Sequence, residues 1–580
     1  MERDLMSKYD VEPETQIQHY RIAVSGSDAI INSFTQVIED LKTDAKIVVE
    51  CYPGVDMTGL VENILALLPI AHLINSEKYA MDASQLRHII DREMTDDRVF
   101  GMMTHYTLDE FYPEAVQATA EIDQLKGCTI VYGTGASLVV NHPDLIVYCD
   151  LARWEIQLRY RQGMANWHQN NPNDDPLHKF KRGYFFDWRV ADRLKKDLLS
   201  KIDYFLDTNN RTIPKLVDGK SLIEGLKSLG SRPFRTVPYF DASVWGGQWM
   251  KHHYELSENG SNYGWAFDGV PEENSLFLRF GKVRIETPAM NLMLIAPKRI
   301  LGEKVYARFG AEFPIRFDYL DTMEGQNLSL QVHPLTGYIQ QHYGMNYTQD
   351  ESYYILEAKP DASVYLGVKA GTTHKKIEES LRQAASGTIK FPDKDYINQL
   401  PAKKGDHFLI PAGTIHCGGA GTVILEISAT PYIFTFKMWD WGRIGLDGKP
   451  RPLHIKEGME NIQLNRDTNW VCDNLVDQFS SVNTIDGHQS ERTGLHPTLE
   501  FIETQRHTIV DSAYIQTHGS VNMLNLVEGE AIIIESLDDT FPPFAVTFGE
   551  TFIIPESVKE YRVRNLYPQV VTKLLQAYVK

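Results

Sequence analysis

Four polar side chains in short segments of β-strand character could together hold a metal ion: Gln331 and His333 in LSLQVHP, Glu351 in DESYYIL and His416 in PAGTIHCGGAG. One amide oxygen, one carboxylate and two imidazoles suit a divalent transition metal such as zinc and leave coordination positions for water or substrate. Gln331 and His333 are two residues apart, so on a strand both side chains point to the same face. We therefore expect three strands to direct these groups to one interior point of a β-barrel.

Taken singly, each of these residues is more typical of a hydrogen-bonded core side chain that binds no metal. Metal binding is favoured because they occur together, with Gln-x-His on one strand face and a histidine after Pro-Ala-Gly-Thr. Cys417 follows His416 directly, and at a strand end its side chain should point away, so it is not included. Other histidines are interpreted as a packed strand residue (His407) or as surface and turn residues (His342, His374 and His454).

Strands and helices alternate along the first 235 residues. The strand candidates are KIVVECY, CTIVYG and DLIVYCDL, and the helix candidates are TGLVENILALL, LARWEIQLRYRQG and WRVADRLKKDLLSKIDYFLD. This alternation predicts a parallel α/β sheet with helices on both faces.

After residue 235 the chain consists mainly of short strands with Gly and Pro turns, which is typical of barrels. The boundary lies in SLGSRPFRTVPYF, and KKIEESLRQAAS and IKEGMENIQ indicate a helical insertion. GDHFLIPAG (405–413) is similar to GETFIIPES (549–557), although a nine-residue match could arise by chance. We expect an α/β domain (1–235), a metal-binding barrel (236–490) and a related barrel without metal (491–580).

Bulk composition excludes some functions. The net charge of −19 over 580 residues argues against nucleic acid or an anionic membrane as the main partner. The five cysteines form no CxxC motif, which favours reduced thiols in the cytoplasm. Neither a signal peptide nor a transmembrane segment is expected, because the best apolar run, LVENILALLPIAHLI, is interrupted by polar residues and is too short to span.

Five segments occur in the order of a known family: FPIRFDYLDTMEGQNLSLQVHP, DESYYILEA, GDHFLIPAGTIHCGG, FKMWDWGRIG and GKPRPLHI. With VWGGQWM at 244–250 they resemble the type I mannose-6-phosphate isomerases, zinc enzymes of the cupin superfamily, from about residue 236 to the end. The resemblance implies two cupin (double-stranded β-helix) barrels, a sugar phosphate as small-molecule partner and one Zn²⁺. It places Gln331, His333, Glu351 and His416 on the zinc ligands and Arg443 on the active-site arginine.

Aldose–ketose isomerisation moves a proton between C1 and C2 through an enediol, so it needs charge stabilisation and a general acid or base. Arg443 could stabilise charge, or it could form a structural ion pair with Asp440. Lys437 follows Phe436 where the family often has Tyr-Arg, and it keeps the positive charge. Glu357 is a candidate acid or base because it lies six residues after Glu351 and shares its strand face; His407 is a weaker one.

Gln349 stands where many members of the family have a lysine two residues before the ligand glutamate. This departure supports two alternatives to the isomerase. One is a non-catalytic or regulatory sugar-phosphate-binding protein, and the other is an isomerase that acts on an unphosphorylated sugar.

KIVVECYPGVDMTGL has the outline of a P-loop, a strand followed by a Gly-containing turn and a helix. Aligned on Thr58, it has Cys51, Asp56 and Met57 where Gly, Gly and Lys belong, so it resembles a degenerate nucleoside or uridine kinase loop. Arginines on the helix after DLIVYCDL could face a phosphate, as in a kinase lid (Arg153, Arg159 and Arg161). Binding of a nucleotide or phosphosugar here is the minor alternative to an ordinary βα turn and a solvated helix face, and phosphotransfer is not expected without the lysine.

Overall fold

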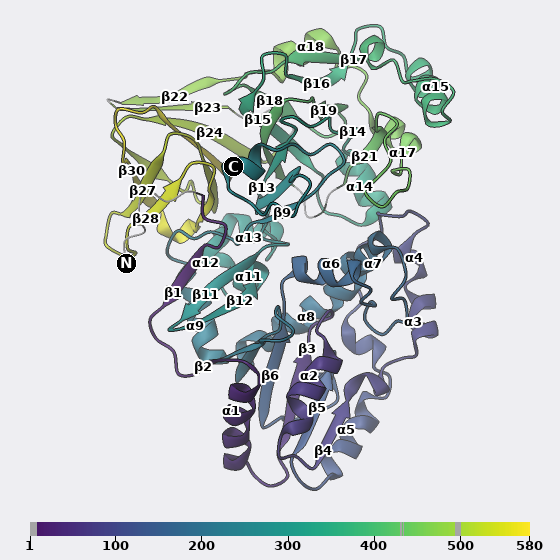
Figure 1. Cartoon of the computed structure of the whole chain (residues 1–580), viewed down its shortest axis with the longest axis vertical. Helices are drawn as coiled ribbons and strands as arrows, with labels where there is room; N and C mark the ends of the chain where they lie inside the picture. Colours follow the sequence, from purple (N-terminus) through teal and green to yellow (C-terminus); the bar gives the residue numbers. More distant parts are fainter. Residues whose placement is uncertain (1–8, 430–431, 433, 486, 494–499) are drawn as a thin grey trace. The chain divides into compact units, whose positions relative to one another are not determined.

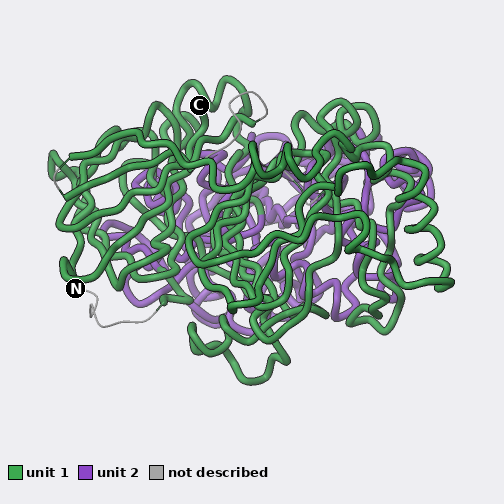
Figure 2. Tube along the Cα trace, turned by 90° about the horizontal axis from the view of Figure 1, so that it is seen from above, with its two compact units in different colours: residues 1–13, 230–272, 297–580 green, residues 14–229, 273–296 purple. Residues whose placement is uncertain are grey.

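A computed structural model describes residues 9–429, 432, 434–485, 487–493 and 500–580 (Figure 1). The chain forms two compact units (Figure 2). Unit 1 comprises residues 1–13, 230–272 and 297–580, and unit 2 comprises residues 14–229 and 273–296. None of the helices in the described ranges combines the length and the apolar character needed to cross a membrane.

Unit 2 contains a seven-stranded sheet in the order β2-β8-β7-β6-β3-β5-β4. Five adjacent strands of this sheet are parallel to one another: β3 (Lys46–Cys51), β4 (His72–Asn75), β5 (Thr129–Gly133), β6 (Leu145–Asp150) and β7 (Tyr204–Asp207). The antiparallel strands β8 (Lys215–Asp218) and β2 (Ala23–Ser25) extend one edge. All six residues of β3 are buried, as expected for a strand covered on both faces.

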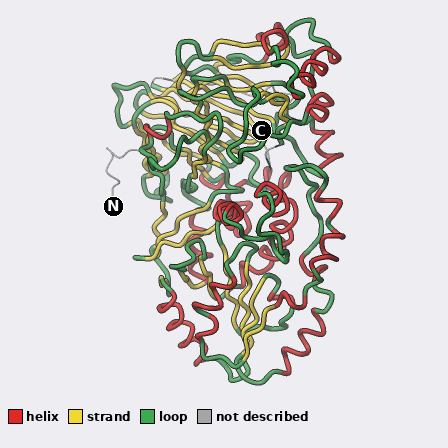
Figure 3. The backbone as a smooth tube through the Cα atoms, turned by 45° about the vertical axis from the view of Figure 1, so that its right-hand side comes forward, coloured by secondary structure: helices red, strands yellow, loops and turns green. Residues whose placement is uncertain are grey.

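Helices cover both faces of this sheet (Figure 3). They include α1 (Ser27–Asp40), α2 (Met57–Asn63), α5 (Ala115–Gln124), α6 (Arg153–Arg161), α8 (Trp188–Leu198) and α9 (Gly219–Leu229). The prediction of one long helix over residues 188–207 was wrong. α8 ends at Leu198, a single 3₁₀ turn follows, and Tyr204–Asp207 forms β7. A short apolar run such as YFLD is compatible with a buried strand as well as with a helix. Here it forms a strand that pairs with β6 and β8.

A later segment of the chain, residues 273–296, belongs to unit 2. It forms β11 (Ser275–Phe280), β12 (Val283–Pro288) and α11 (Ala289–Ile295), and β11 pairs in parallel with β1 (Glu14–Ile17). The division between the units falls at Gly230 rather than at residue 235. The sequence did not predict this insertion, because a β-hairpin within a β-rich region carries no signal of which sheet it joins.

Unit 1 contains two pairs of sheets, which we call the first and the second barrel. The first barrel consists of a six-stranded and a five-stranded sheet. The six-stranded sheet has the order β18-β15-β20-β13-β10-β9, and its strands are β9 (Tyr239–Asp241), β10 (Trp265–Gly269), β13 (Arg316–Asp321), β15 (Asp350–Ala358), β18 (His407–Ile410) and β20 (Thr422–Ala429). The five-stranded sheet has the order β17-β16-β19-β14-β21, and its strands are β14 (Leu330–Val332), β16 (Ser363–Val368), β17 (Ile397–Pro401), β19 (His416–Gly418) and β21 (Phe436–Trp439). The helices α14 (Thr336–Tyr343), α15 (His374–Ala385) and α17 (Ile455–Asn461) interrupt them.

The second barrel also pairs two sheets, and its first strand in the chain is β22. One sheet has the order β22-β23-β24-β31-β26-β29, with β22 (Ser480–Ile485), β23 (His488–Arg492), β24 (Ile502–Ile509), β26 (Asn522–Glu528), β29 (Thr551–Ile554) and β31 (Thr572–Val579). The other has the order β25-β30-β27-β28, with β25 (Ser512–Gln516), β27 (Ala531–Ser536), β28 (Phe544–Thr547) and β30 (Glu560–Asn565). One apolar core cluster draws side chains from both sheets, including Leu524, Phe552, Ile532 and Val563.

The weak sequence repeat occupies equivalent places in the two barrels. GDHFLIPAG contains β18 and GETFIIPES contains β29, and each is an edge strand of a six-stranded sheet. The neighbouring strands follow in the same order, β18-β15-β20-β13 and β29-β26-β31-β24, with all neighbours antiparallel. This shared order supports a common design for the two barrels.

Candidate metal centre

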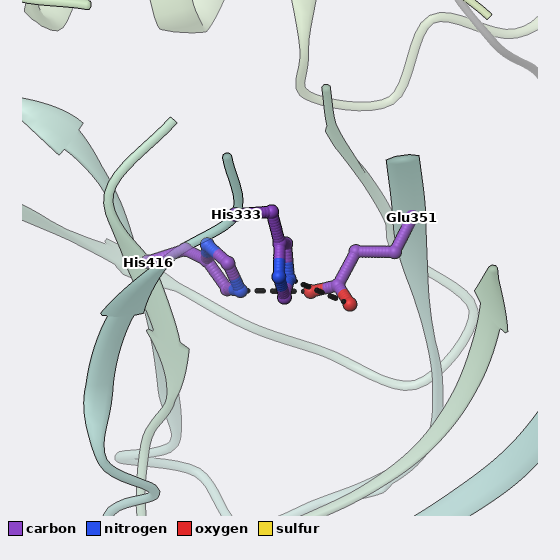
Figure 4. A group of neighbouring side chains, drawn as sticks. All are labelled: His333, Glu351 and His416. Atoms are coloured by element: carbon purple, nitrogen blue, oxygen red, sulfur yellow. Dashed lines mark ion pairs between the residues drawn. The ribbon is translucent and has the colours of Figure 1, made fainter. Parts of the chain in front are cut away.

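Three of the four predicted ligands converge inside the first barrel (Figure 4). The Nε2 atom of His333 lies 3.0 Å from Oε2 of Glu351, and Nε2 of His416 lies 2.7 Å from Oε1 of the same carboxylate. All three side chains are 0% exposed. They come from both sheets, because Glu351 lies on β15, His416 on β19, and His333 directly after β14. This is the one group of three or more histidine, cysteine or carboxylate ligands that the described residues bring together.

The other ring nitrogen of each histidine is tied to the backbone. Nδ1 of His333 is 2.9 Å from the carbonyl oxygen of Phe434, and Nδ1 of His416 is 2.8 Å from that of Thr414. A carbonyl can only accept, so each Nδ1 carries the proton and donates it. The neutral form of each ring then directs the lone pair of Nε2 at the carboxylate, which is the tautomer of a metal-ligating histidine.

The facing atoms do not form good hydrogen bonds with one another. Nε2 of His333 and Oε1 of Glu351 are buried and have no hydrogen-bond partner. A lone pair pointing at a carboxylate oxygen is unfavourable unless a second proton or a cation lies between them. A divalent cation would accept electron pairs from all three groups at once, so the donor set fits a metal.

Gln331 is the fourth predicted ligand and lies beside this group. It pairs directly with His416 across the strands β14 and β19, and its Nε2 is 3.2 Å from Nε2 of His416. Directly opposed residues of antiparallel strands place their side chains on the same face. Rotation of the amide by half a turn would present the oxygen, which is the ligand atom, in place of the nitrogen.

The charge distribution of the centre without metal favours a carboxylate and an imidazolium. Burial lowers the pKa of His333, but Glu351, the carbonyl of Phe434 and Asp350 together raise it by more, so the net shift is upward. Burial raises the pKa of Glu351, and the two histidines more than compensate, which leaves it well below the usual value. Protons and a metal cation therefore compete for the same buried atoms.

Lys437 and Arg443, both predicted to act in catalysis, lie on β21 of the five-stranded sheet and on the loop that follows β21. Lys437 on β21 is the direct cross-strand partner of Gln331, so its half-buried side chain shares the face of the ligands. Arg443 binds Asp440 and donates from Nη1 to the carbonyl oxygen of Asn327 at 2.6 Å. Asp440 also accepts from Ser329 Oγ at 2.8 Å, two residues before Gln331, so the ion pair is linked to the ligand strand.

Glu357 lies outside the centre. It is on the same strand as Glu351, but six residues of strand separate the two by about 20 Å. A bulge also shifts the register between Ile355 and Glu357. The carboxylate of Glu357 pairs with Nζ of Lys404 at 2.6 Å and is partly exposed. Alternation along a strand indicates a shared face but gives no proximity, and this was the weakness of the prediction.

The remaining histidines are not part of the metal group. His407 is buried, and its Nδ1 donates to the carbonyl oxygen of Thr493 at 2.7 Å, as expected for a packed strand histidine. His342 stacks on Tyr338, and His374 is partly exposed. His454 was interpreted as a surface or turn residue, but it is buried at the start of α17.

Two residues of the centre's surroundings were not assigned from the sequence. Gln349 donates from Nε2 to Glu351 Oε2 at 2.9 Å and to Glu426 Oε1 at 3.3 Å. Glu426 is 4% exposed on β20. A glutamate inside the apolar strand TVILEISA was the signal available for it, because a buried carboxylate needs a partner or a function.

The P-loop-like segment of unit 2 has structural roles for its unusual residues. Asp56 caps α2 by accepting from the backbone N–H of Gly59 at 3.0 Å. Arg159 is fully buried and donates to the carbonyl oxygens of Gly54 and Thr208, so it is neither a lid residue nor part of a solvated face. Arg153 pairs with Asp192 at 2.5 Å. The third arginine of this helix, Arg161, lies over the ring of Trp154.

The fold and the site define a mixed α/β protein with two pairs of sheets in unit 1, the first enclosing a buried His–Glu–His group that could hold a metal, and a parallel α/β sheet in unit 2. Residues 28–231 match a family described as a domain of unknown function, DUF8485. The chain is similar to mannose-6-phosphate isomerase ManA of Bacillus subtilis (strain 168), with 22% identity over 347 residues, 59% of this chain and 99% of that protein. Mannose-6-phosphate isomerase of Streptococcus mutans is 24% identical over 322 residues, 55% of this chain and 91% of that protein.

Solved structures with partial similarity carry related names. The mannose 6-phosphate isomerase from Bacillus subtilis has a TM-score of 0.47 at 19% identity and covers 60% of this chain and 99% of its own. A phosphomannose isomerase variant from Salmonella typhimurium has a TM-score of 0.45 at 14% identity, with coverage of 60% and 99%.

Proposed function

We propose that the chain is a zinc-dependent aldose–ketose isomerase that interconverts mannose 6-phosphate and fructose 6-phosphate. Similarity to curated isomerases over 59% of the chain indicates an isomerase enzyme. We infer the substrate from the names of those relatives and the metal from the donor set of the site. Zinc is preferred because two imidazoles, a carboxylate and an amide oxygen suit a borderline-soft divalent ion.

The observation that supports this proposal is the buried group of His333, Glu351 and His416. Both imidazoles are fixed by backbone carbonyls with Nε2 directed inward, and the atoms that face one another lack hydrogen-bond geometry. Gln331 lies within reach as a fourth ligand. When bound, the metal would act as a Lewis acid that lowers the energy of negative charge developing on the sugar oxygens.

The residues around the group have distinct tasks in this proposal. Lys437, on the same face as Gln331, contributes positive charge beside the site. Arg443 and Arg451 both pair with Asp440, so this cluster carries one net positive charge at the end of β21, which suits a phosphate or a developing oxyanion. Gln349 holds Glu351 through its amide N–H and so fixes the orientation of the carboxylate.

A coupled assay with mannose 6-phosphate, run with the purified chain before and after chelation and combined with metal analysis, tests the proposal. We expect about one zinc per chain, turnover that the chelator abolishes, and recovery when zinc is restored. Turnover that is unaffected by complete metal removal contradicts the metal-dependent mechanism. Absence of turnover in the zinc-loaded protein contradicts the isomerase.

A second candidate is a non-catalytic or regulatory sugar-phosphate-binding protein with a degenerate kinase-like unit. Two observations favour it: Gln349 cannot carry the charge or proton of the lysine that it replaces, and Asp56 caps a helix where a P-loop would bind phosphate. Binding of mannose 6-phosphate without turnover would support this candidate. A panel of unphosphorylated sugars in the same assay tests the third alternative.

A further inference from the structure

We propose that an inner wall of the first barrel, next to the metal centre, binds the uncharged hydroxyl groups of a polyhydroxylated ligand. We define the inner wall as six residues on β13, β15, β20 and the segment before β15: Arg316, Asp318, Gln349, Tyr353, Glu426 and Ser428. The proposal rests on the proposed function for the identity of that ligand as a sugar.

Strand register places these side chains on one face. Glu351 pairs with Ser428, which pairs with Arg316 on the next strand. In the neighbouring row Tyr353 pairs with Glu426, which pairs with Asp318. Directly opposed residues, and residues two apart on one strand, share a face, so both rows lie on the side of Glu351. The ring of Tyr353 lies 5.9 Å from that of His416, which places the wall beside the metal group.

Three polar atoms of the inner wall are buried without a hydrogen-bond partner: Oε1 of Gln349, the hydroxyl of Tyr353 and Oγ of Ser428. Their side chains are 3%, 0% and 0% exposed. The Nε2 atom of Gln349 donates to the carboxyl groups of Glu351 and Glu426, which leaves Oε1 as the unpaired amide atom. Buried polar groups in native proteins are almost always paired with protein, water or ligand, so three neighbouring unpaired atoms indicate a missing partner.

The second barrel provides an internal comparison. Its counterparts of Ser428, Glu426 and Glu351, by strand order and register, are Tyr578, Gln576 and Asn522, and those of Arg316 and Asp318 are Glu503 and Gln505. There the polar groups bind one another: Tyr578 donates to Glu503 at 2.7 Å, Gln505 donates to Tyr578 at 2.8 Å, and Gln576 donates to Asn522 at 2.7 Å.

By the same register the counterpart of Tyr353 is Leu524, an apolar core residue, whereas that of Ser428 is the hydrogen-bonded Tyr578. Ser428 is therefore unpaired at a position that is paired in the second barrel. The unpaired atoms of Gln349, Tyr353 and Ser428 can be hydrogen-bonded by a molecule that brings both donors and acceptors. They lie beside the candidate metal group.

The charges of the wall decide which part of a ligand it can hold. Asp318 and Glu426 carry carboxyl groups beside Glu351, and Arg316 pairs with Asp318 at 3.3 Å. Of the six wall residues only Arg316 is cationic, and its pairing with Asp318 leaves no uncompensated positive charge at the wall for a phosphate dianion. A hydroxyl group can donate to Gln349 Oε1 and accept from Tyr353 or Ser428, so the wall suits the neutral carbon chain of a sugar.

Binding of D-mannitol and D-mannitol 1-phosphate to the zinc-loaded full chain, measured by titration calorimetry, tests the inference. Neither probe has a carbonyl group, so neither is isomerised. Tyr353→Phe and Ser428→Ala each remove one unpaired hydroxyl, and we expect each to raise Kd about five- to tenfold, by the same factor for both probes. The melting temperature of each ligand-free variant should not fall, because no existing hydrogen bond is lost.

Tyr578→Phe is the matched control, since it removes a bonded hydroxyl at the equivalent position of the second barrel. It should lower the melting temperature and leave both Kd values unchanged. Unchanged Kd values in Tyr353→Phe and Ser428→Ala, a loss confined to the phosphorylated probe, or no binding of either probe by the unaltered chain would each overturn the inference. If mannose 6-phosphate is not turned over but the probes respond as expected, the proposed function fails and the inner wall stands.

Discussion

Each of the two histidines of the candidate metal centre directs its Nδ1 atom at a backbone carbonyl. Phe434 and Thr414 supply these carbonyls, and their positions are set by the strands that precede or follow them. Such an arrangement is insensitive to side-chain replacement around the site, and it holds each ring in one tautomer. Loss of a histidine itself cannot be compensated in the same way.

Replacing His333 by alanine should remove the metal and the activity together. One of the imidazole ligands is lost, and the cavity that remains offers no other donor of the same reach, so we expect zinc content near zero after dialysis and turnover at least 100-fold lower. Metal analysis and the coupled assay measure both. His407→Ala is the control, because His407 is equally buried and bonded to a backbone carbonyl but lies outside the group; it should keep its zinc. A His333→Ala protein with full zinc content would exclude this site.

In the metal-free protein, the stabilisation contributed by His333 and Glu351 should be largest between about pH 4.5 and 6.5. The folded pKa of His333 is raised above 6.5, so its contribution is complete below that pH and is lost as pH rises through the folded value. The folded pKa of Glu351 lies below 4.5, so its contribution is present above 4.5 and is lost as pH falls through the folded value. Thermal melts of chelated protein across this range measure the effect. Zinc-loaded protein should instead gain stability above pH 6.5, because protons no longer compete with the metal, and identical profiles with and without zinc would contradict the assignment.

At the scale of elements, strand patterns were the most informative signal. Gln-x-His on β14 and the Pro-Ala-Gly-Thr turn before β19 predicted the three-residue group, because alternation determines the face and a turn determines the strand end. The same rule misplaced Glu357. Alternation puts side chains on one face along the whole length of a strand, but a site occupies only a few residues of it. The inner wall was not predictable in this way, because Tyr353 and Ser428 become neighbours only through the pairing of β15 with β20.

A buried ion cluster contributes to the junction between β10 and β29 within unit 1. Arg235 is 2% exposed and pairs with Glu550 at 2.7 Å and with Asp268 at 3.3 Å. It also donates to the carbonyl oxygen of Thr551 at 3.1 Å. The side chain therefore ties the first barrel to the second.

Arg235→Met should lower the free energy of unfolding by about 3–5 kcal/mol, because two carboxylates stay buried without their cation. Chemical denaturation followed by fluorescence measures the change. Arg382→Met is the control, since Arg382 is 55% exposed and pairs with Glu378 on the surface of α15; its effect should stay within about 0.5 kcal/mol. Equal effects of the two substitutions would show that the cluster adds nothing beyond a surface pair.

At the scale of the whole molecule, the α/β unit is not a contiguous stretch of sequence. Residues 273–296 leave the first barrel, complete unit 2 and return. Several of their apolar side chains are fully buried, among them Leu278, Ile285 and Leu292. Asn291 on α11 donates to Asp150 at the end of β6 at 2.8 Å, so the insertion also completes a buried polar group of the parallel sheet. A domain boundary placed where the pattern of helices and strands changes misses this insertion, because the pattern indicates the type of element and not the sheet that it joins.

A fragment of residues 14–229 should therefore fold poorly, whereas the same fragment joined by a flexible linker to residues 273–296 should fold. Without the insertion, β1 loses its only strand partner among the described residues, and the faces that cover Leu278 and Leu292 become exposed to water. Far-UV circular dichroism should show a cooperative melt for the joined fragment and a broad or absent transition for the shorter one. Asn291→Ala in the joined fragment should lower its stability by about 1–3 kcal/mol, because Asp150 loses a buried donor. A cooperative melt of residues 14–229 at the same temperature as the joined fragment would show that the unit is complete without the insertion.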